Sequence, residues 1–463
     1  MGGVSAGHSG LPAVSGLFSR LDVPAMLRDY PMGAAFLDGP AALSRDALRA
    51  LQERRFARVM ARAWQVPFYR DRWAAAGMEP GDISGLDDLP QVPSFSKDDL
   101  MASVAAAPPF GAFDGRSAEN SFAVFHTTSG TTGVPQPLFY GAEDREIQNL
   151  LLARAYRLMG LRDDDIVHSV YGFGTVNGGH YVREAVTHFT DALLVPAGTG
   201  RDMPSEQQVE TMARLGATVL VGFGDYVRHL AETAQRKGLA IPLRLVLGHF
   251  GRDDRQSVSD AWGGAAVYDW YGVGDTGVIA AESPSRNGLH IFEDAHVVEA
   301  LDPETGTPVE DGHAGNLCAT VLFKTGIYPI VRFDTKDLTV LSPPDPASGI
   351  AFRRMSGFEG RSDNMVKLRG INVYPTAVGA LLADHGALTG EYVCRVFRVG
   401  GREEMAVTVE AREPGESLAE EVAERLKRGL GVQVAVELAE PGGTAALTQI
   451  RERQKPLRLI DER

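Results

Sequence analysis

Short apolar runs alternate with amphipathic patterns through the middle of the chain. Each run ends in glycine or at a turn, and the segments between the runs place apolar residues three or four positions apart. This alternation predicts βα units and a largely parallel sheet covered by helices. The predicted strands lie within residues 164–173, 191–198, 217–224, 243–250 and 265–272, and two of the helices within 204–216 and 226–238.

The segments before and after this region follow other patterns. Residues from about 41 to 65 predict one long amphipathic helix, because apolar residues recur at helical spacing among Ala, Leu and Arg. Ser96, followed three residues later by Asp99, is typical of a helix start close to a capping box. After Gly288 the pattern becomes strand, turn, strand over residues 289–301 and 316–323, which predicts an antiparallel piece.

The end of the chain predicts a second, smaller unit. Two paired strands, a helix and a further strand are expected within residues 391–401, 403–411, 417–431 and 432–440. Such a unit can fold on its own. We therefore predict an α/β fold. Residues 1–360 form a large N-terminal domain, with helix-covered, mostly parallel sheets and a β-barrel-like antiparallel piece, and residues 361–463 form a small mobile α+β domain.

Composition excludes several classes of protein. The net charge of −14, from 60 acidic and 46 basic residues, argues against sequence-independent nucleic-acid binding, which needs a basic surface. Cys318 and Cys394 are the only two cysteines and form no disulfide framework, so a reducing cytoplasm is the expected compartment. The first residues lack the pattern of a signal peptide, and the absence of a long apolar run predicts no membrane span.

Residues 126–135, HTTSGTTGVP, are the most informative segment. Glycines let the backbone approach a polyanion, and hydroxyl and N–H groups can donate to phosphate oxygens. A plain surface loop rich in Ser, Thr and Gly is the alternative interpretation, and the Walker pattern is absent. The order of residues nevertheless closely resembles the phosphate loop of the adenylate-forming superfamily, which includes acyl-CoA synthetases, peptide-synthetase adenylation domains and luciferases.

The resemblance implies that this loop contacts the phosphates of ATP. Val134 stands where the family usually has lysine, a departure that bears on phosphate affinity. The loop residues that the resemblance assigns to ATP are Thr128, Ser129, Gly130, Thr131, Thr132 and Gly133.

Residues 268–275, YDWYGVGD, resemble the family segment in which an aromatic residue lies near adenine and an acid coordinates magnesium. Asp275 replaces the usual Glu, and Gly274 the usual Ser or Thr. The carboxylate is retained, as Mg²⁺ bound to phosphate oxygens requires. The resemblance assigns metal binding and catalysis to Asp275, and assigns nucleotide contacts to Asp269, Trp270, Tyr271 and Gly272.

Three later segments match the superfamily in the expected order. Asp337 corresponds to the aspartate that binds the ribose hydroxyls, and Arg361 to the arginine that reaches ribose or phosphates. Asp363 corresponds to the hinge between the domains, and the resemblance assigns an ATP or AMP contact to Lys367 of the same junction segment. Lys455 matches the C-terminal catalytic lysine, which neutralises charge as acyl-AMP forms, an electrostatic effect on the order of 3 kcal/mol.

Within the superfamily, the chain looks most like the phenylacetate–CoA ligase branch, from about residue 47 to the C-terminus. Its branch-specific segments lie at 66–70, 96–100, 165–168, 171–174 and 288–294. Gly251 stands where the branch lines adenine, with Arg252 as a departure that is either a substrate contact or a solvated side chain. Some branch members carry a cysteine-containing zinc site, but Ser283 and residues 342–352 lack those cysteines, so we predict no zinc.

The acyl pocket is expected after the turn at residues 171–174. Aromatic side chains beside glycines suit a flat ring. Asn177 and His180 are candidates for recognising a hydroxyl or amino group on an aryl acid, and a purely structural histidine is the alternative for His180. The predicted pocket residues are Tyr171, Phe173, Asn177, Gly178, His180, Phe223 and Tyr226.

The resemblance implies an ATP- and Mg²⁺-dependent enzyme that converts a carboxylic acid into acyl-AMP and then into a CoA thioester. An alternative acceptor is a carrier-protein thiol or an amine in a biosynthetic pathway. A third hypothesis is an adenylate-binding protein without turnover, motivated by the departures at Val134, Gly274 and Asp275. A homodimer is expected from the resemblance alone.

Overall fold

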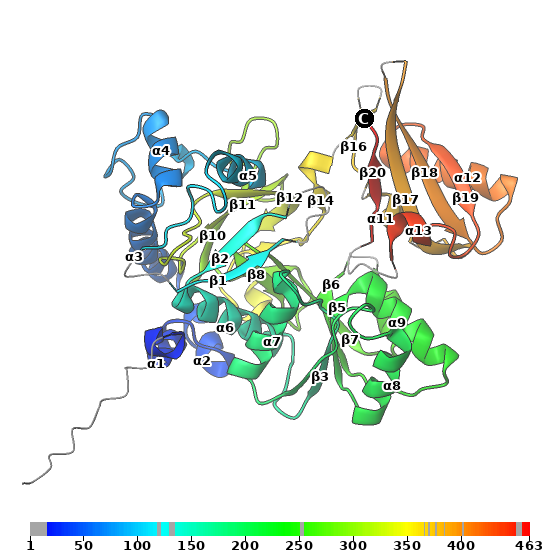
Figure 1. Cartoon of the computed structure of the whole chain (residues 1–463), viewed down its shortest axis with the longest axis horizontal. Helices are drawn as coiled ribbons and strands as arrows, with labels where there is room; N and C mark the ends of the chain where they lie inside the picture. Colours follow the sequence, from blue (N-terminus) through cyan, green and yellow to red (C-terminus); the bar gives the residue numbers. More distant parts are fainter. Residues whose placement is uncertain are drawn as a thin grey trace, which may run out of the picture.

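A 12-stranded sheet forms the centre of the larger part of the molecule (Figure 1). The computed structural model describes residues 16–117, 122–128, 135–250, 254–364, 366–368, 371–375, 377–383, 385–400, 402–450 and 456–463. The five strands predicted from the middle of the sequence are present and pair in parallel. They are β3 (Ile166–Ser169), β4 (Leu193–Pro196), β5 (Val219–Phe223), β6 (Leu245–His249) and β7 (Ala266–Val273).

Helices cover both faces of these parallel strands. Val219 and Val221 of β5 belong to one hydrophobic core, whereas Leu220 between them belongs to another. Because successive side chains of a strand point to opposite faces, a strand buried on both sides has a continuous apolar sequence. One face packs on α6 (Ala142–Leu158) and α7 (Asn177–Phe189), and the other on α8 (Ser205–Leu215), α9 (Gly224–Arg236) and α10 (Asp254–Ala261).

Antiparallel strands continue the same sheet beyond β7, as the change of pattern after Gly288 predicts. They are β8 (Gly277–Glu282), β9 (Leu289–Ile291), β10 (His296–Leu301), β11 (Ala314–Val321), β12 (Phe333–Ser342) and β13 (Arg354–Met355), with β14 (Gly360–Arg361) paired to β12. A separate hairpin is formed by β1 (Val124–Thr127) and β2 (Pro137–Tyr140).

The N-terminal helices include the predicted long helix, α3 (Arg45–Ala63). The predicted capping box at Ser96 is confirmed, since the backbone N–H of Ser96 donates to Asp99 Oδ2 at 2.8 Å. Ser96 is the N-cap of α5 (Lys97–Ala106). The other helices of this region are α1 (Val23–Asp29), α2 (Gly33–Leu37) and α4 (Pro67–Ala75). Short 3-10 helices lie at Phe18–Arg20, Pro40–Ala42, Leu89–Gln91, Pro346–Ser348 and Ser362–Asn364.

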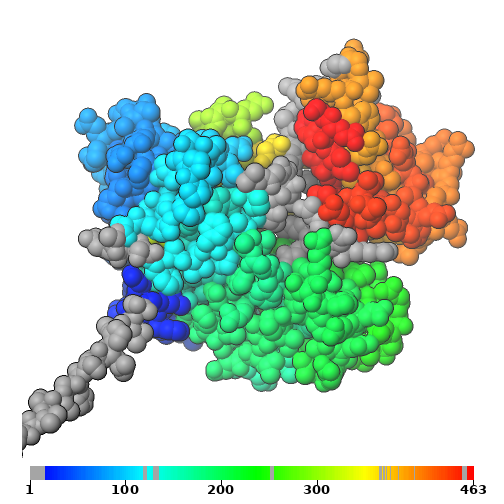
Figure 2. All heavy atoms as spheres, viewed as in Figure 1, coloured from blue at the N-terminus to red at the C-terminus, as the bar shows by residue number. Residues whose placement is uncertain are grey.

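The C-terminal residues form a second unit with its own hydrophobic core (Figure 2, orange to red). A four-stranded sheet in the order β19-β18-β17-β20 packs against α12. The elements are β15 (Val366–Leu368), β16 (Ile371–Val373), α11 (Ala377–Leu382), β17 (Leu388–Val399), β18 (Arg402–Ala411), α12 (Glu416–Leu430), β19 (Ala435–Ala439), α13 (Ala445–Thr448) and β20 (Leu459–Asp461). The two strands, helix and strand predicted here are confirmed, while the boundary between residues 360 and 361 stays a prediction.

Candidate active site

Aromatic side chains meet at the carboxyl ends of the parallel strands, the edge where sheets of this type bind ligands. The ring of Tyr171, which follows β3, lies 4.8 Å from that of Phe223 at the end of β5. Phe223 stacks on His249, the last residue of β6, at 5.1 Å, and His249 lies 4.3 Å from Trp270 in β7. We call these four residues the aromatic cluster.

Tyr171 and Phe223 were predicted as pocket residues and Trp270 as a nucleotide contact, whereas His249 was not predicted. The signal was present, because His249 ends a buried strand at the same edge as Phe223. The structure places the predicted Tyr226 apart from the cluster. Its hydroxyl lies 3.0 Å from Ser205 Oγ and 3.1 Å from Gln208 Nε2, on the side of the sheet that α8 covers.

The turn after β3 brings the remaining predicted pocket residues together. Gly179 N–H donates to Gly172 O at 3.0 Å, which ties the first turn of α7 to the turn at 171–174. His180 lies 5.2 Å from the ring of Phe173 and 4.9 Å from that of His126 in β1. His180 Nε2 lies 2.9 Å from Gly174 O, so this nitrogen already has a structural partner.

A buried ion pair lies behind the first turn of α7. Arg145 of α6 donates through Nη1 to Asn177 Oδ1 and through Nε to Glu184 Oε2, each at 2.6 Å. Arg145 Nη2 is buried and has no partner among the described residues. The sequence did not reveal Arg145 because charged residues on a helix are usually solvated, whereas α6 is buried on nearly all sides.

His126 is buried against this network. Burial lowers its pKa to about 4, with Arg145 as the next cause, so the ring is neutral near pH 7. Nδ1 lies 3.3 Å from Thr175 O. Since a carbonyl oxygen only accepts hydrogen bonds, the proton of the neutral ring belongs on Nδ1. Nε2 is then an acceptor, and it is buried without a partner among the described residues.

The predicted metal ligand, Asp275, lies in the turn between β7 and β8. Its Oδ1 accepts hydrogen bonds from Gln136 Nε2 and from Tyr328 Oη, both at 2.7 Å. Lys324 Nζ donates to the backbone oxygen of Asp275 at 2.7 Å. Burial raises the pKa of Asp275 and lowers the pKa of Lys324 to about 8. Gln136, Tyr328 and Lys324 come from distant segments and were not predicted.

Asp337 lies in β12, and both of its carboxylate oxygens are engaged. Tyr271 Oη donates to Oδ2 at 2.7 Å, and Arg361 Nη1 donates to Oδ1 at 2.8 Å. Arg361 also donates through Nε to Asp363 Oδ1 at 2.8 Å. The structure therefore brings together the predicted ribose ligand, the predicted phosphate or ribose ligand and the predicted hinge residue.

Asp269 and Gly272 lie in β7 beside this group. Burial raises the pKa of Asp269 well above its usual value, and Arg255 of α10 lies 3.7 Å from Oδ2. A Cβ at Gly272 would lie 2.3 Å from Gly277 O, so the tight pairing of β7 and β8 requires glycine here.

Part of the predicted nucleotide site lies outside the described residues. Thr128 is described, and its Oγ1 accepts a hydrogen bond from Gln136 N at 3.2 Å. Lys367 lies in β15, and its side chain is outside the description. The residues that lie wholly outside are Ser129, Gly130, Thr131, Thr132, Gly133, Val134, Gly251, Arg252 and Lys455.

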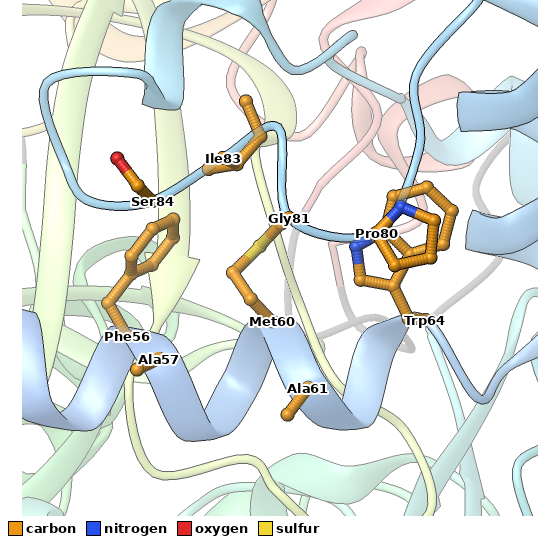
Figure 3. A pocket seen from close by; sticks show the side chains of 9 residues that line it. All are labelled: Phe56, Ala57, Met60, Ala61, Trp64, Pro80, Gly81, Ile83 and Ser84. Carbon is orange, nitrogen blue, oxygen red and sulfur yellow. The ribbon is translucent and has the colours of Figure 1, made fainter.

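Two surface cavities lie elsewhere. One, of about 350 Å³, is formed where Phe56, Met60 and Trp64 project from the α3 segment toward the loop at 80–84 (Figure 3). The other, of about 500 Å³, is lined by residues that include Arg154 and Ser283. Neither cavity includes a predicted site residue. Within the described ranges, no group of three or more His, Cys, Asp or Glu could hold a metal ion, and no helix is suited to cross a membrane.

Comparison with known proteins places this geometry in a family. The sequence matches the model of AMP-binding enzymes over residues 81–321 and that of the AMP-binding enzyme C-terminal domain over residues 370–463. The phenylacetate–coenzyme A ligase of Aromatoleum evansii is 31% identical over 441 residues, covering 91% of this chain and 96% of that protein.

Comparison with solved structures also finds similarity to a CoA ligase. A crystal structure of 2-hydroxyisobutyryl-CoA ligase in the postadenylation state, in complex with R3-HIB-AMP, has a TM-score of 0.81 at 27% identity, covering 92% of this chain and 91% of that one. The same ligase with 2-HIB-AMP and CoA, in the thioesterification state, has a TM-score of 0.67 at 28% identity and equal coverage.

The fold and the matched models define an AMP-binding, adenylate-forming enzyme. More narrowly, the chain belongs to the family of the phenylacetate–CoA ligases, whose members are AMP-forming acid–CoA ligases. The resemblance and the fold class inferred from the sequence are thereby confirmed.

Proposed function

We propose that this protein activates a carboxylic acid with ATP and transfers the acyl group to CoA. The observation that carries the proposal is the position of β7 and the loop after it. Trp270 joins the aromatic cluster, Tyr271 donates to Asp337, and Asp275 follows four residues later. One short segment thus joins an acyl site, a ribose ligand and a phosphate-side carboxylate, the arrangement that an acyl adenylate requires.

In the first half-reaction, a carboxylate oxygen attacks the α-phosphorus of ATP. The bond to the bridging oxygen breaks, and pyrophosphate leaves. In the second, a thiol attacks the acyl carbon, AMP leaves, and the thiol proton passes to solvent. Catalysis of such a phosphoryl transfer is mostly positioning and charge stabilisation. We assign ribose binding to Asp337 and Arg361, phosphate binding to the 128–133 loop, and charge neutralisation to Lys455.

Asp275 has the chemistry of a Mg²⁺ ligand, because hard cations prefer carboxylate oxygens. Both of its side-chain hydrogen bonds from described residues go to Oδ1, which leaves Oδ2 for a cation. An ion bound there with ATP would neutralise charge on the phosphates.

We further propose that the acid is an aryl acid with a hydroxyl group. Three buried polar atoms without described partners lie around the first turn of α7: Arg145 Nη2, His126 Nε2 and Tyr171 Oη. Arg145 contacts Asn177, His126 contacts His180, and the ring of Tyr171 lies beside Gly178. A hydroxyl has the chemistry to pair with either group, since it can accept from Arg145 or donate to His126.

The test is pyrophosphate release from Mg·ATP with paired acids that differ only by a hydroxyl, each with and without CoA. The panel includes phenylacetates, benzoates and short aliphatic hydroxy acids. We expect release with an aryl hydroxy acid, steady turnover when CoA is added, and at least about tenfold lower kcat/KM for the partner that lacks the hydroxyl. Pyrophosphate release at the same rate with and without CoA would favour a carrier protein or an amine as acceptor.

Lys455→Ala tests the assigned catalytic lysine. We expect acyl-AMP formation to fall about 100-fold or more, with an unchanged melting temperature, because one preorganised charge is removed. Lys427→Ala, in α12 and paired with Glu424, is the matched control and should retain activity. Unchanged adenylation in Lys455→Ala would remove the assigned role, and absence of release with every acid in the wild type would favour adenylate binding without turnover.

Homodimerisation rests on the family resemblance alone. Sedimentation equilibrium of the purified chain would measure it, and a single species of about 50 kDa, the mass of one chain of 49.8 kDa, would reject it.

A further inference from the structure

One ion pair joins the C-terminal unit to the helix that follows the acyl-site strand. Arg458 Nη2 lies 3.1 Å from Asp225 Oδ2, although 233 positions separate the two residues. Asp225 is the second residue of α9 and comes two positions after Phe223 of the aromatic cluster. Arg458 lies immediately before β20 of the C-terminal sheet. The contact therefore links the acyl site to the mobile part of the protein.

Arg458 is fixed firmly within the C-terminal unit. It donates through Nη1 to Glu391 Oε2 at 2.8 Å and to Tyr392 O at 3.0 Å, and its guanidinium lies 4.9 Å from the centre of the Tyr392 ring. The backbone oxygen of Arg458 accepts from Cys394 N at 2.9 Å. Nη2 also donates to Glu391 Oε1 at 3.2 Å, so Glu391 and Tyr392 hold the guanidinium in one orientation where it meets Asp225.

The partner is equally well placed on α9. Asp225 lies in the first turn, where the helix dipole favours a negative charge, and it also pairs with Arg228. Side-chain exposure is 16% for Arg458 and 23% for Asp225, so water screens the pair only in part. Truncating one member removes the charged contact between the two units, while the other member keeps a partner within its own unit, Glu391 for Arg458 and Arg228 for Asp225.

We propose that Arg458 and Asp225 form a latch that holds the C-terminal unit in its adenylating orientation. Lys455, the assigned catalytic lysine, comes three positions before Arg458 in the sequence. In agreement, the whole chain is more similar to the postadenylation structure of 2-hydroxyisobutyryl-CoA ligase than to its thioesterification structure. Arg458 is thus a positioning residue, and this role rests on the proposed function.

The test separates the two half-reactions in Asp225→Asn and Arg458→Gln. We expect acyl-AMP formation to fall about 10- to 100-fold in each variant. Thioester formation from supplied acyl-AMP and CoA should stay within about twofold of wild type, because that step does not need the latch. The double variant should lose no more than either single variant, since both remove the same interaction.

Arg395→Gln is the matched control. Arg395 pairs with Glu462 inside the C-terminal unit, and both side chains are 42% exposed. It should leave both half-reactions unchanged. Asp225→Asn also controls for folding, because it leaves every contact within the C-terminal unit intact. An equal loss in both half-reactions, or unchanged adenylation in Asp225→Asn, would overturn the latch.

A structural readout keeps this test independent of the proposed function. Fluorescent labels, one on each unit, report the distance between them in the absence of substrate. Asp225→Asn and Arg458→Gln should broaden the distance distribution, and Arg395→Gln should not. If the wild type releases no pyrophosphate with any acid, the proposed function fails while this measurement still decides the latch: an unchanged distribution in both latch variants would reject it.

Discussion

The residues of the proposed nucleotide site form hydrogen bonds with one another. Asp337 accepts from Tyr271 at one oxygen and from Arg361 at the other, and Arg361 continues to Asp363. A ribose hydroxyl that binds Asp337 has to share these oxygens or replace one of the donors. We therefore expect the proposed ribose binding at Asp337 to be coupled, through Arg361, to the predicted hinge residue Asp363.

Asp337→Asn should weaken ATP binding. The substitution removes the charge that Arg361 and the ribose hydroxyls share, and hydrogen bonds to a charged group contribute about 1.5–3 kcal/mol each. We expect the KM for ATP to rise about 10- to 100-fold, with the KM for the acid little changed, in steady-state pyrophosphate assays. Asp334→Asn, on the same strand and paired with Lys336, is the control. An unchanged KM for ATP in Asp337→Asn would contradict the assignment.

At the scale of elements, the close packing of α7 against the turn after β3 positions the residues of the proposed acyl site. A Cβ at Gly179 would lie 2.5 Å from Gly172 O and 2.9 Å from Tyr171 O. These are backbone atoms, which cannot rotate away. Glycine at this position allows α7 to begin against the turn that carries Tyr171 and Phe173, so the close approach of an element and a turn decides where the pocket residues lie.

Gly179→Ala should therefore move the turn and damage acid binding. Overpacking of this kind costs about 1–3 kcal/mol of stability. We expect the KM for the acid to rise at least about tenfold and the melting temperature to fall, with a smaller effect on the KM for ATP. Gly386→Ala is the control, since an added Cβ there meets nothing within 4 Å. Normal kinetics for Gly179→Ala would show that the turn tolerates the displacement.

At the scale of the whole molecule, buried histidines make stability depend on pH. Burial lowers the pKa of His126, His290 and His296 to about 4 in each case. The unfolded chain binds a proton at each of these positions below its ordinary pKa of about 6.5, whereas the folded chain does so only near pH 4. The stability that these neutral histidines contribute is therefore fully present above pH 6.5 and is lost as the pH falls toward 4. Asp144, with its pKa raised by burial to about 6, acts in the opposite direction.

His296→Gln isolates one of these contributions. His296 is fully buried against Phe323 and beside the carbonyl groups of Phe292 and Thr276. Below pH 6.5, the wild type should lose about 1.4 kcal/mol of unfolding free energy per pH unit through this residue. We expect the free energy of unfolding, measured with urea between pH 4.5 and 7, to fall less steeply with decreasing pH in His296→Gln than in the wild type. His313→Gln, at an exposed position, should keep the wild-type dependence of the unfolding free energy on pH. An equal pH dependence in all three proteins would show that His296 does not contribute to it.

The sequence determined the elements and the family. Continuous apolar runs such as 217–224 and 243–250 identified parallel strands because a strand buried on both faces has no polar side. The order of Asp275, Asp337, Arg361 and Lys455 carried the resemblance, and the family comparison confirms it. Their individual roles stay predictions, since residue type and order do not measure contact with a ligand.

Only the tertiary structure decided which side chains meet. His249 joins the aromatic cluster, Arg145 supports the first turn of α7, and Lys324 reaches Asp275, because packing brings together segments that are far apart in sequence. Tyr226 was predicted beside Phe223 but faces Ser205, since Phe223 packs against one hydrophobic core of the sheet and Tyr226 of α9 belongs to the core on the other face. The Arg458–Asp225 pair has no sequence signal at all, because the charge and spacing of either residue alone are those of an ordinary surface residue.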